Sequence, residues 1–242
     1  MKTTDSKVKF LTTYSIFMTV IMVSLSLFSF KVYKKIENFD EINVKRINII
    51  ENDGTIRMVL SNKERQHSGR MDGKDWEKRA RPSGLVFFND EGDECGGLIY
   101  QTKKTKDGLI SGMSISMDRY KDDQVLQLSN QEEVINGKLW SQRGIHINDY
   151  PMDSHLDKRS AMLKEAEKIT NPEEREKKIN EIHDRYGAKN LLFLGKTSGN
   201  SQGLFLSDSK GKPKMMVYVD DQGNPKIQTF NAKGEIKDFI VE

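Results

Sequence analysis

One cysteine and one histidine define the first chemical possibility in this sequence. Cys95 is the only cysteine, and a thiol becomes a catalytic nucleophile when a base removes its proton. His146 is the best candidate base, because alternation places Ile145 and Ile147 on the opposite face of a predicted strand, and Asp149 could orient its ring. Such an enzyme needs Cys95 exposed and within about 3–4 Å of His146. The acidic neighbours of Cys95 should raise the pKa of the thiol, which weakens this hypothesis.

The cysteine lies in an acidic segment, residues 87–98 (FFNDEGDECGGL). Asp90, Asp93 and Glu94 could offer oxygen ligands to Ca²⁺, but their spacing differs from that of a calcium-binding loop. The alternative is a hairpin turn with solvated acidic side chains. A single cysteine excludes the usual structural zinc sites, and the chain has no phosphate-binding loop, nucleophile elbow or H-E-x-x-H motif. We therefore expect no metal and no cofactor.

A basic loop is the second candidate site. Residues 62–82 form a longer connection than a compact β domain usually needs. Trp76 lies there among basic residues that include Arg70 and Arg79, and an exposed tryptophan beside arginine could recognise a carbohydrate, an anionic lipid or a protein. The alternative is a flap that folds Trp76 onto the sheet.

Short alternating runs must position these residues. In residues 112–117, Met113, Ile115 and Met117 point to one face and Ser114 and Ser116 to the other, which is typical of a β-strand. Twelve such runs, counting this one, are separated by Gly, Asn and Asp. The others are residues 46–50, 55–61, 84–88, 97–101, 124–129, 143–148, 190–194, 203–207, 214–219, 226–230 and 235–241.

An internal repeat shows how the strands are joined. Residues 84–92 (GLVFFNDEG) align without a gap on residues 203–211 (GLFLSDSKG), and each unit is a strand followed by a polar turn that ends in glycine. This pattern predicts an all-β fold of repeated β-hairpins, in a barrel-like or curved meander sheet. A propeller is the alternative, but its usual blade of about 40–45 residues fits the spacing poorly.

Residues 153–186 interrupt the β pattern with two predicted helices. Ser154 is the expected cap of the first, residues 156–169, and Asn171 that of the second, which should stop at Gly187. The apolar stripe of these helices is narrow, so we expect a helical hairpin packed on the sheet. A protruding arm that binds a partner is the alternative.

The N-terminal region has the features of a membrane anchor. Residues 10–30 contain no charge and, as a helix, would span roughly the ~30 Å hydrocarbon core. A cleaved signal peptide would have a shorter apolar run and a small-residue exit. The expected organisation is a basic tail (1–9), a transmembrane helix (10–30), a juxtamembrane linker (31–40) and a β-repeat domain (41–242).

Charge is divided unevenly along the 242 residues. Residues 1–35 carry six lysines and one aspartate, a local charge of +5, whereas the remaining 33 basic and 35 acidic residues give −2. The large domain therefore lacks the basic surface that nucleic-acid binding requires. Lysines flank the helix on both sides, but a short basic tail before a single anchor usually stays inside, so we expect an exported C-terminal domain.

Three segments resemble a known group of proteins: RINIIENDGTIRMVLSN (46–62), RPSGLVFFNDEGDECGGLIY (81–100) and GLFLSDSKGKPKMMVYVDDQGNP (203–225). They are similar to an uncharacterised family of bacterial membrane-anchored proteins, over most of residues 40–240, and NDEGDECGGL is the most specific part. The resemblance implies a bacterial origin and supplies no catalytic residues.

Together these features favour a binding or scaffolding module at the bacterial cell envelope. Its expected partners are the membrane, through residues 10–30, and a protein or another envelope component. The alternatives are a thiol enzyme centred on Cys95 with His146, and a β-barrel that carries a small ligand in an apolar cavity.

Overall fold

The computed structural model describes residues 2–29 and 38–239, in two units, Met1–Asn43 and Val44–Glu242. The first unit contains the helix α1 (Lys2–Ser29), whose segment Thr4–Leu27 is long and apolar enough to cross a membrane. The helix includes most of the predicted basic tail. Most of the predicted linker, residues 31–40, falls on residues 30–37 and lies outside the described residues.

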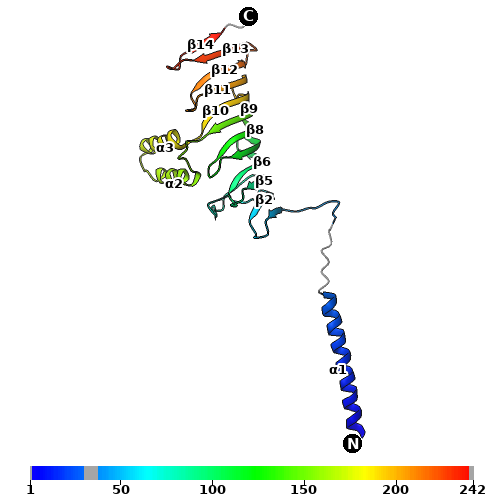
Figure 1. Ribbon diagram of the computed structural model, residues 1–242. Helices are drawn as coiled ribbons and strands as arrows, with labels where there is room; N and C mark the ends of the chain where they lie inside the picture. Colours follow the sequence, from blue (N-terminus) through cyan, green and yellow to red (C-terminus); the bar gives the residue numbers. More distant parts are fainter. Residues whose placement is uncertain (1, 30–37, 240–242) are drawn as a thin grey trace. The chain divides into compact units, whose positions relative to one another are not determined.

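The second unit is dominated by one antiparallel sheet in which each strand pairs with its neighbours in the chain (Figure 1). Its strands are β1 (Arg46–Ile50), β2 (Ile56–Ser61), β5 (Ser83–Phe88), β6 (Glu94–Thr105), β7 (Gly108–Asp118), β8 (Gln124–Ile135), β9 (Lys138–Asp149), β10 (Lys189–Lys196), β11 (Gln202–Ser207), β12 (Pro213–Val219), β13 (Pro225–Phe230) and β14 (Ile236–Phe239). The two-residue strands β3 (Arg70–Met71) and β4 (Lys74–Asp75) pair separately.

The predicted all-β meander of twelve strands is confirmed; of the two forms expected for it, the meander sheet is found and the barrel is not. β1 and β14 are the two edges of an open sheet and do not pair with each other. Neither a barrel nor a propeller forms. Alternating residues and hairpin turns specify which strands are neighbours, but closure also requires a consistent tilt and stagger of all strands, which these short runs do not encode.

The repeat corresponds to one kind of hairpin turn. Asn89 Oδ1 accepts hydrogen bonds from the backbone N–H groups of Glu91 and Asp93, at 2.9 and 3.0 Å. Asp208 Oδ1 does the same for Lys210 and Lys212. Two further turns follow this pattern, and each of the four has a glycine of positive φ at its fourth position. A short polar side chain followed by glycine therefore returns the chain at each of these turns.

The register divides the sheet into two faces. Residues directly opposite each other on paired strands share a face. We call aliphatic face the side that carries one apolar residue from every strand, and flap face the other side. The aliphatic row consists of Ile47, Leu60, Leu85, Leu98, Ile115, Leu128, Ile145, Leu194, Leu204, Val217, Ile227 and Phe239.

The main buried core lies on the flap face near β2 and β5. Val59, Val86 and Phe88 form it. The connection 62–82, which we call the flap, covers them, and the ring of His67 meets Phe88 edge-on at 4.8 Å between centroids. Burial lowers the pKa of His67, so the imidazole is kept neutral.

Farther along the flap face, aromatic rings replace a covering layer. His146, Phe193, Phe205 and Tyr218 stack across β9 to β12, with neighbouring centroids 4.6 to 5.7 Å apart. A Cβ at Gly144 would lie 2.6 Å from the ring of Phe193, so the absence of a side chain at Gly144 makes room for this ring on the sheet. Aromatic rings lying over strand glycines shield the backbone of a single-layer sheet.

The insertion between β9 and β10 forms the predicted helical hairpin, α2 (Leu156–Glu167) and α3 (Pro172–Tyr186). Asn171 caps α3 through its side chain as expected. The cap predicted for α2 is wrong: His155 is the cap residue and makes no side-chain cap hydrogen bond. Ser154 instead donates to the carbonyl of Tyr186, 2.9 Å away, and so joins the two ends of the insertion.

Candidate functional site

The structure does not bring the proposed thiol nucleophile and its base together. Cys95 is on β6 and His146 on β9, with β7 and β8 between them, which separates them by about 14 Å at the usual strand spacing. Burial, and next the charge of Asp118, raise the pKa of the Cys95 thiol. Asp149 pairs with Lys189 across the strands and accepts from the N–H of Tyr150. At this separation His146 lies beyond the direct reach of the Cys95 thiol.

The three acidic candidates for a metal site each meet a different cation. Asp90 pairs with Arg57, and Asp93 pairs with Lys121. Glu94 accepts two hydrogen bonds of 2.7 Å from Arg81, in a half-buried bidentate ion pair. Across residues 2–29 and 38–239, no group of three or more potential ligands could hold a metal ion. The acidic segment is thus a hairpin turn whose carboxylates serve ion pairs.

Lys121 ties the flap to the sheet. Its ammonium lies 2.7 Å from carboxylate oxygens of Asp72 in the flap and of Glu91 in the β5–β6 turn, and it also pairs with Asp93. Hydrogen bonds with these carboxylates, that with Asp72 first, raise the pKa of Lys121. This cluster fastens three separate segments and holds the flap over the core.

The predicted recognition residues of the basic loop are folded into that flap. Trp76 is half-buried against Gly69, where an added Cβ would lie 2.7 Å from the indole. The Arg79 guanidinium stacks 4.6 Å from the centre of the indole and donates to the carbonyl of Ser68. Arg70 lies 3.6 Å from a carboxylate oxygen of Asp75. This arrangement supports the alternative reading of a folded flap over that of an exposed recognition tip.

A buried carboxyl group beside the flap has an unusual environment. Asp118, at the end of β7, has a buried Oδ1 without a hydrogen-bond partner. Burial, followed by the charges of Asp123 and Glu94, raises the pKa of Asp118 to about 7, and the opposing effect of Arg81 is smaller. Ionisation of Asp118 therefore opposes folding.

Asp118→Asn is expected to stabilise the protein above neutral pH. Between the ordinary pKa of 3.8 and about 7, native Asp118 holds a proton that the unfolded chain has lost. The free energy of unfolding therefore falls as the pH rises through this window, and asparagine removes this part of the fall. Urea unfolding at pH 8 should show a gain of about 1–3 kcal/mol for Asp118→Asn. Asp107→Asn, at an exposed turn, is the control, and an equal gain there would contradict the assignment.

The aliphatic face is the largest feature without a structural role inside the chain. Seven of the twelve residues in its row are exposed, with exposed fractions such as 46% for Leu60, 51% for Leu128 and 47% for Leu194, and the other five are partly exposed. A second row beside the first is also mainly apolar. It contains Ile49, Met58, Phe87, Gly96, Met117, Leu126, Ile147, Leu192, Leu206, Met215, Thr229 and Lys237.

A contiguous apolar surface of this kind normally marks a binding site. Antiparallel sheets bury their apolar face against another layer, and exposed apolar patches above a few hundred Å² are unusual in monomers. The alternation of single strands was visible in the sequence, for example at Ile115 and Met117. If the sheet closed into a barrel with an apolar interior, the aliphatic face would line that interior. In the open sheet the aliphatic face is part of the protein surface.

Comparison with protein-family models, curated proteins and solved structures gives no match.

Proposed function

We propose that this chain is a non-catalytic, membrane-anchored scaffold of the bacterial cell envelope, which assembles by packing the aliphatic faces of its own copies together. The observation that carries the proposal is the uninterrupted row of twelve apolar residues, one from each strand of the sheet, that runs from Ile47 to Phe239. The separation of Cys95 from His146 argues against thiol chemistry, and the open sheet lacks the enclosed interior of a ligand-carrying barrel.

The size of the aliphatic face fits a stable interface. Twelve strands at about 4.8 Å extend for about 58 Å, and two rows of residues along each strand cover about 14 Å. The product is about 800 Å² for each copy, which is the standard area that one partner buries in a specific protein–protein interface. Sheets that pack face to face lie about 10 Å apart, with their side chains interdigitated.

A second copy matches this surface better than an unrelated partner would. The first row carries no charge or hydrogen-bonding side chain from end to end, so its occupant must offer an apolar surface of the same length. Another copy has such a surface because its sequence and fold are the same. In a symmetric assembly the same rows meet across the interface. Burial of the first row leaves no unpaired polar group, and the polar side chains of the second row, Thr229 and Lys237, lie on the last two strands of the sheet.

The N-terminal helix supports this arrangement. If α1 is retained as an anchor, all copies enter the membrane in the same direction and are confined to one plane, which raises their effective concentration. The basic tail before α1 favours a cytoplasmic N-terminus and an extracytoplasmic sheet domain. The resemblance to bacterial membrane-anchored proteins agrees with an envelope location.

The mass of the intact assembly tests the proposal. The chain is 27.8 kDa, and native mass spectrometry of the full-length protein released from mild detergent should give a whole multiple of this mass that is at least two. Dilution over two orders of magnitude should leave most of the assembly intact. A monomer at every concentration would overturn the proposal, as would a monomer that carries bound lipid on this face.

A further inference from the structure

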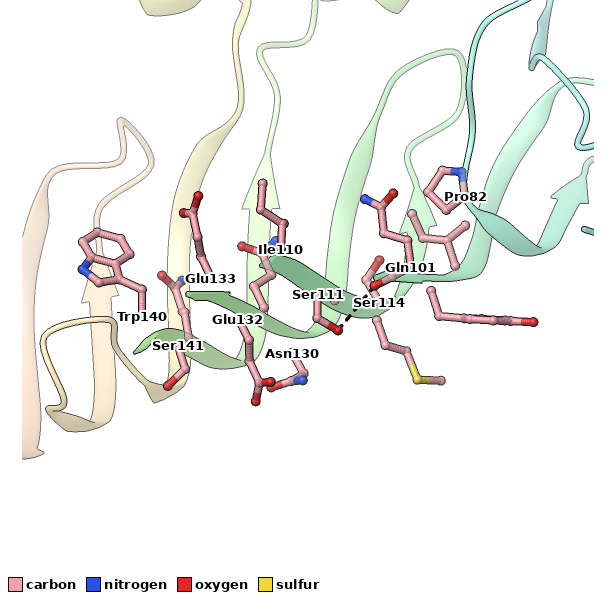
Figure 2. A pocket seen from close by; sticks show the side chains of 16 residues that line it. Pro82, Gln101, Ile110, Ser111, Ser114, Asn130, Glu132, Glu133, Trp140 and Ser141 are labelled. Atoms are coloured by element: carbon pink, nitrogen blue, oxygen red, sulfur yellow. Dashed lines mark hydrogen bonds between the residues drawn. The ribbon is translucent and has the colours of Figure 1, made fainter. Parts of the chain in front are cut away.

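A hollow over the central hairpins forms a second candidate site, on the flap face and thus opposite the proposed interface. The strands β6 to β9 have 11 or 12 residues each and extend beyond the rest of the sheet as two long hairpins. The hollow has a volume of about 380 Å³ and lies over β6 to β9, which is within the usual range for ligand sites. Figure 2 shows Trp140, Glu133, Ile110 and Gln101 on one side of the ribbon and Ser141 on the other.

Gly112 creates the space in this hollow. It occupies the position between Gln101 and Gln131 in a row of paired residues that ends at Gln142. The φ of Gly112 is not positive, and an added Cβ would meet nothing closer than the carbonyl oxygen of Asn130 at 3.2 Å. That distance is tighter than ordinary contact, so a side chain at this position would need a small local shift, and its absence leaves room between the glutamines.

Most of the groups around the hollow are neutral hydrogen-bonding groups and apolar surfaces. Gln101, Gln131 and Gln142 each offer an amide that both donates and accepts. Trp140 stands on the next row with an exposed fraction of 61%, and Ile110 lies on the same row. An exposed indole beside amides combines a flat apolar platform with directional polar contacts.

The charged side chains that line the hollow are both acidic. The lining contains no lysine, arginine or histidine. Of its two carboxylates, Glu132 is bound by Arg143 at 2.6 Å, and Glu133 lies opposite Trp140 at the rim. The nearest basic side chains by register are Lys103, opposite Ile110, and Lys138, two residues before Trp140; both lie beside the lining on the same face. An anionic ligand would therefore find a carboxylate and no basic group in the lining itself.

We propose that this hollow binds a short segment of a neutral oligosaccharide. A pyranose ring has an apolar C–H face that stacks on an indole and a rim of hydroxyl groups that donate and accept hydrogen bonds. Trp140 on β9 provides the platform for one ring, the three glutamine amides hold the hydroxyl groups, and Gly112, two strands away on β7, leaves space for a neighbouring ring of the segment. The site belongs to one copy of the chain and does not depend on assembly through the aliphatic face.

Tryptophan fluorescence gives a direct test with the full-length chain in detergent. The chain has two tryptophans, so Trp76→Phe leaves Trp140 as the only indole. Maltohexaose, cellohexaose and chitohexaose are the neutral probes, and hexagalacturonate is the anionic one. At least one neutral probe should shift the emission of Trp140 and bind in calorimetry. No response to any neutral probe up to about 10 mM would overturn the proposal.

Two variants and one control locate the site. Trp140→Ala removes the platform, and Gly112→Val fills the hollow. Each variant should weaken binding by about tenfold or more, which corresponds to about 1.4 kcal/mol. Leu139→Ala is the matched control, because Leu139 adjoins Trp140, has an exposed fraction of 60% and points to the other face. Circular dichroism checks that each variant is folded. Wild-type affinity in both variants, or binding of hexagalacturonate as tight as that of the neutral probes, would contradict the assignment.

Discussion

Leu128→Asp is expected to separate the assembled protein into monomers. Leu128 lies in the middle of the aliphatic row, between Ile115 and Ile145 on the neighbouring strands, and 51% of it is exposed in the single chain. In the monomer an aspartate there remains hydrated. At the interface between two copies it would be buried without a partner, which costs several kcal/mol. Native mass spectrometry or sedimentation should show a dissociation constant raised by at least about 100-fold.

Gln127→Asp is the matched control for this experiment. Gln127 precedes Leu128 on the same strand and points to the flap face, where it pairs with Ser116 and His146. The added charge is the same, so this variant should keep the wild-type mass. If both variants dissociate, the assembly does not use the aliphatic face. If Leu128→Asp stays assembled while circular dichroism shows it folded, the proposed interface is wrong.

Arg159→Ala is expected to have the largest effect on stability. Arg159 on α2 reaches the β7–β8 turn, where its guanidinium lies 2.7 Å from Asp122, whose exposed fraction is 1%. It also donates to Ser154 and to the carbonyl of Tyr186, and it stacks over the ring of Tyr150. Alanine would leave the Asp122 carboxylate buried and unpaired, which typically costs about 3–5 kcal/mol.

Chemical unfolding and hydrogen exchange measure this effect. Urea unfolding should report the loss of stability, and the amides of residues 153–186 should exchange faster because the helical hairpin is released from the turn. The double variant Arg159→Met with Asp122→Asn removes both charges and should recover a large part of the loss. A single variant within about 0.5 kcal/mol of wild type would show that the buried ion pair does not attach the insertion.

The local elements of this fold could be predicted well from the sequence. The twelve runs match the twelve strands of the sheet, because alternating residues and polar turns with glycine act within a single hairpin. The N-cap at Asn171 is equally local, since its side chain bonds to the first turn of the same helix. Ser154 failed as a cap because a residue far along the chain, Tyr186, offers a better acceptor.

The features that could not be predicted from the sequence are those that depend on contacts between segments far apart in the chain. The long hairpins of β6 to β9 were underestimated because their outer halves are polar, as in residues 101–107, and resemble loops. The distance between Cys95 and His146 depends on the strand order, which places β7 and β8 between them. For the acidic residues of the 87–98 segment, the expected alternative of solvated side chains misses their ion pairs. Lys121 from the β7–β8 turn pairs with Glu91 and Asp93, Arg81 from the flap pairs with Glu94, and Arg57 from β2 pairs with Asp90.

The exposure of the aliphatic face has the same cause. Alternation identifies which side of each strand is apolar, and both a closed barrel and an open sheet satisfy it. Only the register shows that residues such as Ile115 and Leu128 form one row across all twelve strands, and only the open edges show that this row faces solvent in a single copy.

Cross-linking in native membranes tests the central claim most directly. In a Cys95→Ser background, Ile115→Cys places a single thiol on the aliphatic face, and Ser116→Cys places one on the flap face of the same strand. With a short bis-maleimide, the account predicts a covalent dimer for Ile115→Cys and none for Ser116→Cys. A dimer formed only through Ser116→Cys, or none from Ile115→Cys while the thiol is accessible to a small maleimide, would contradict it.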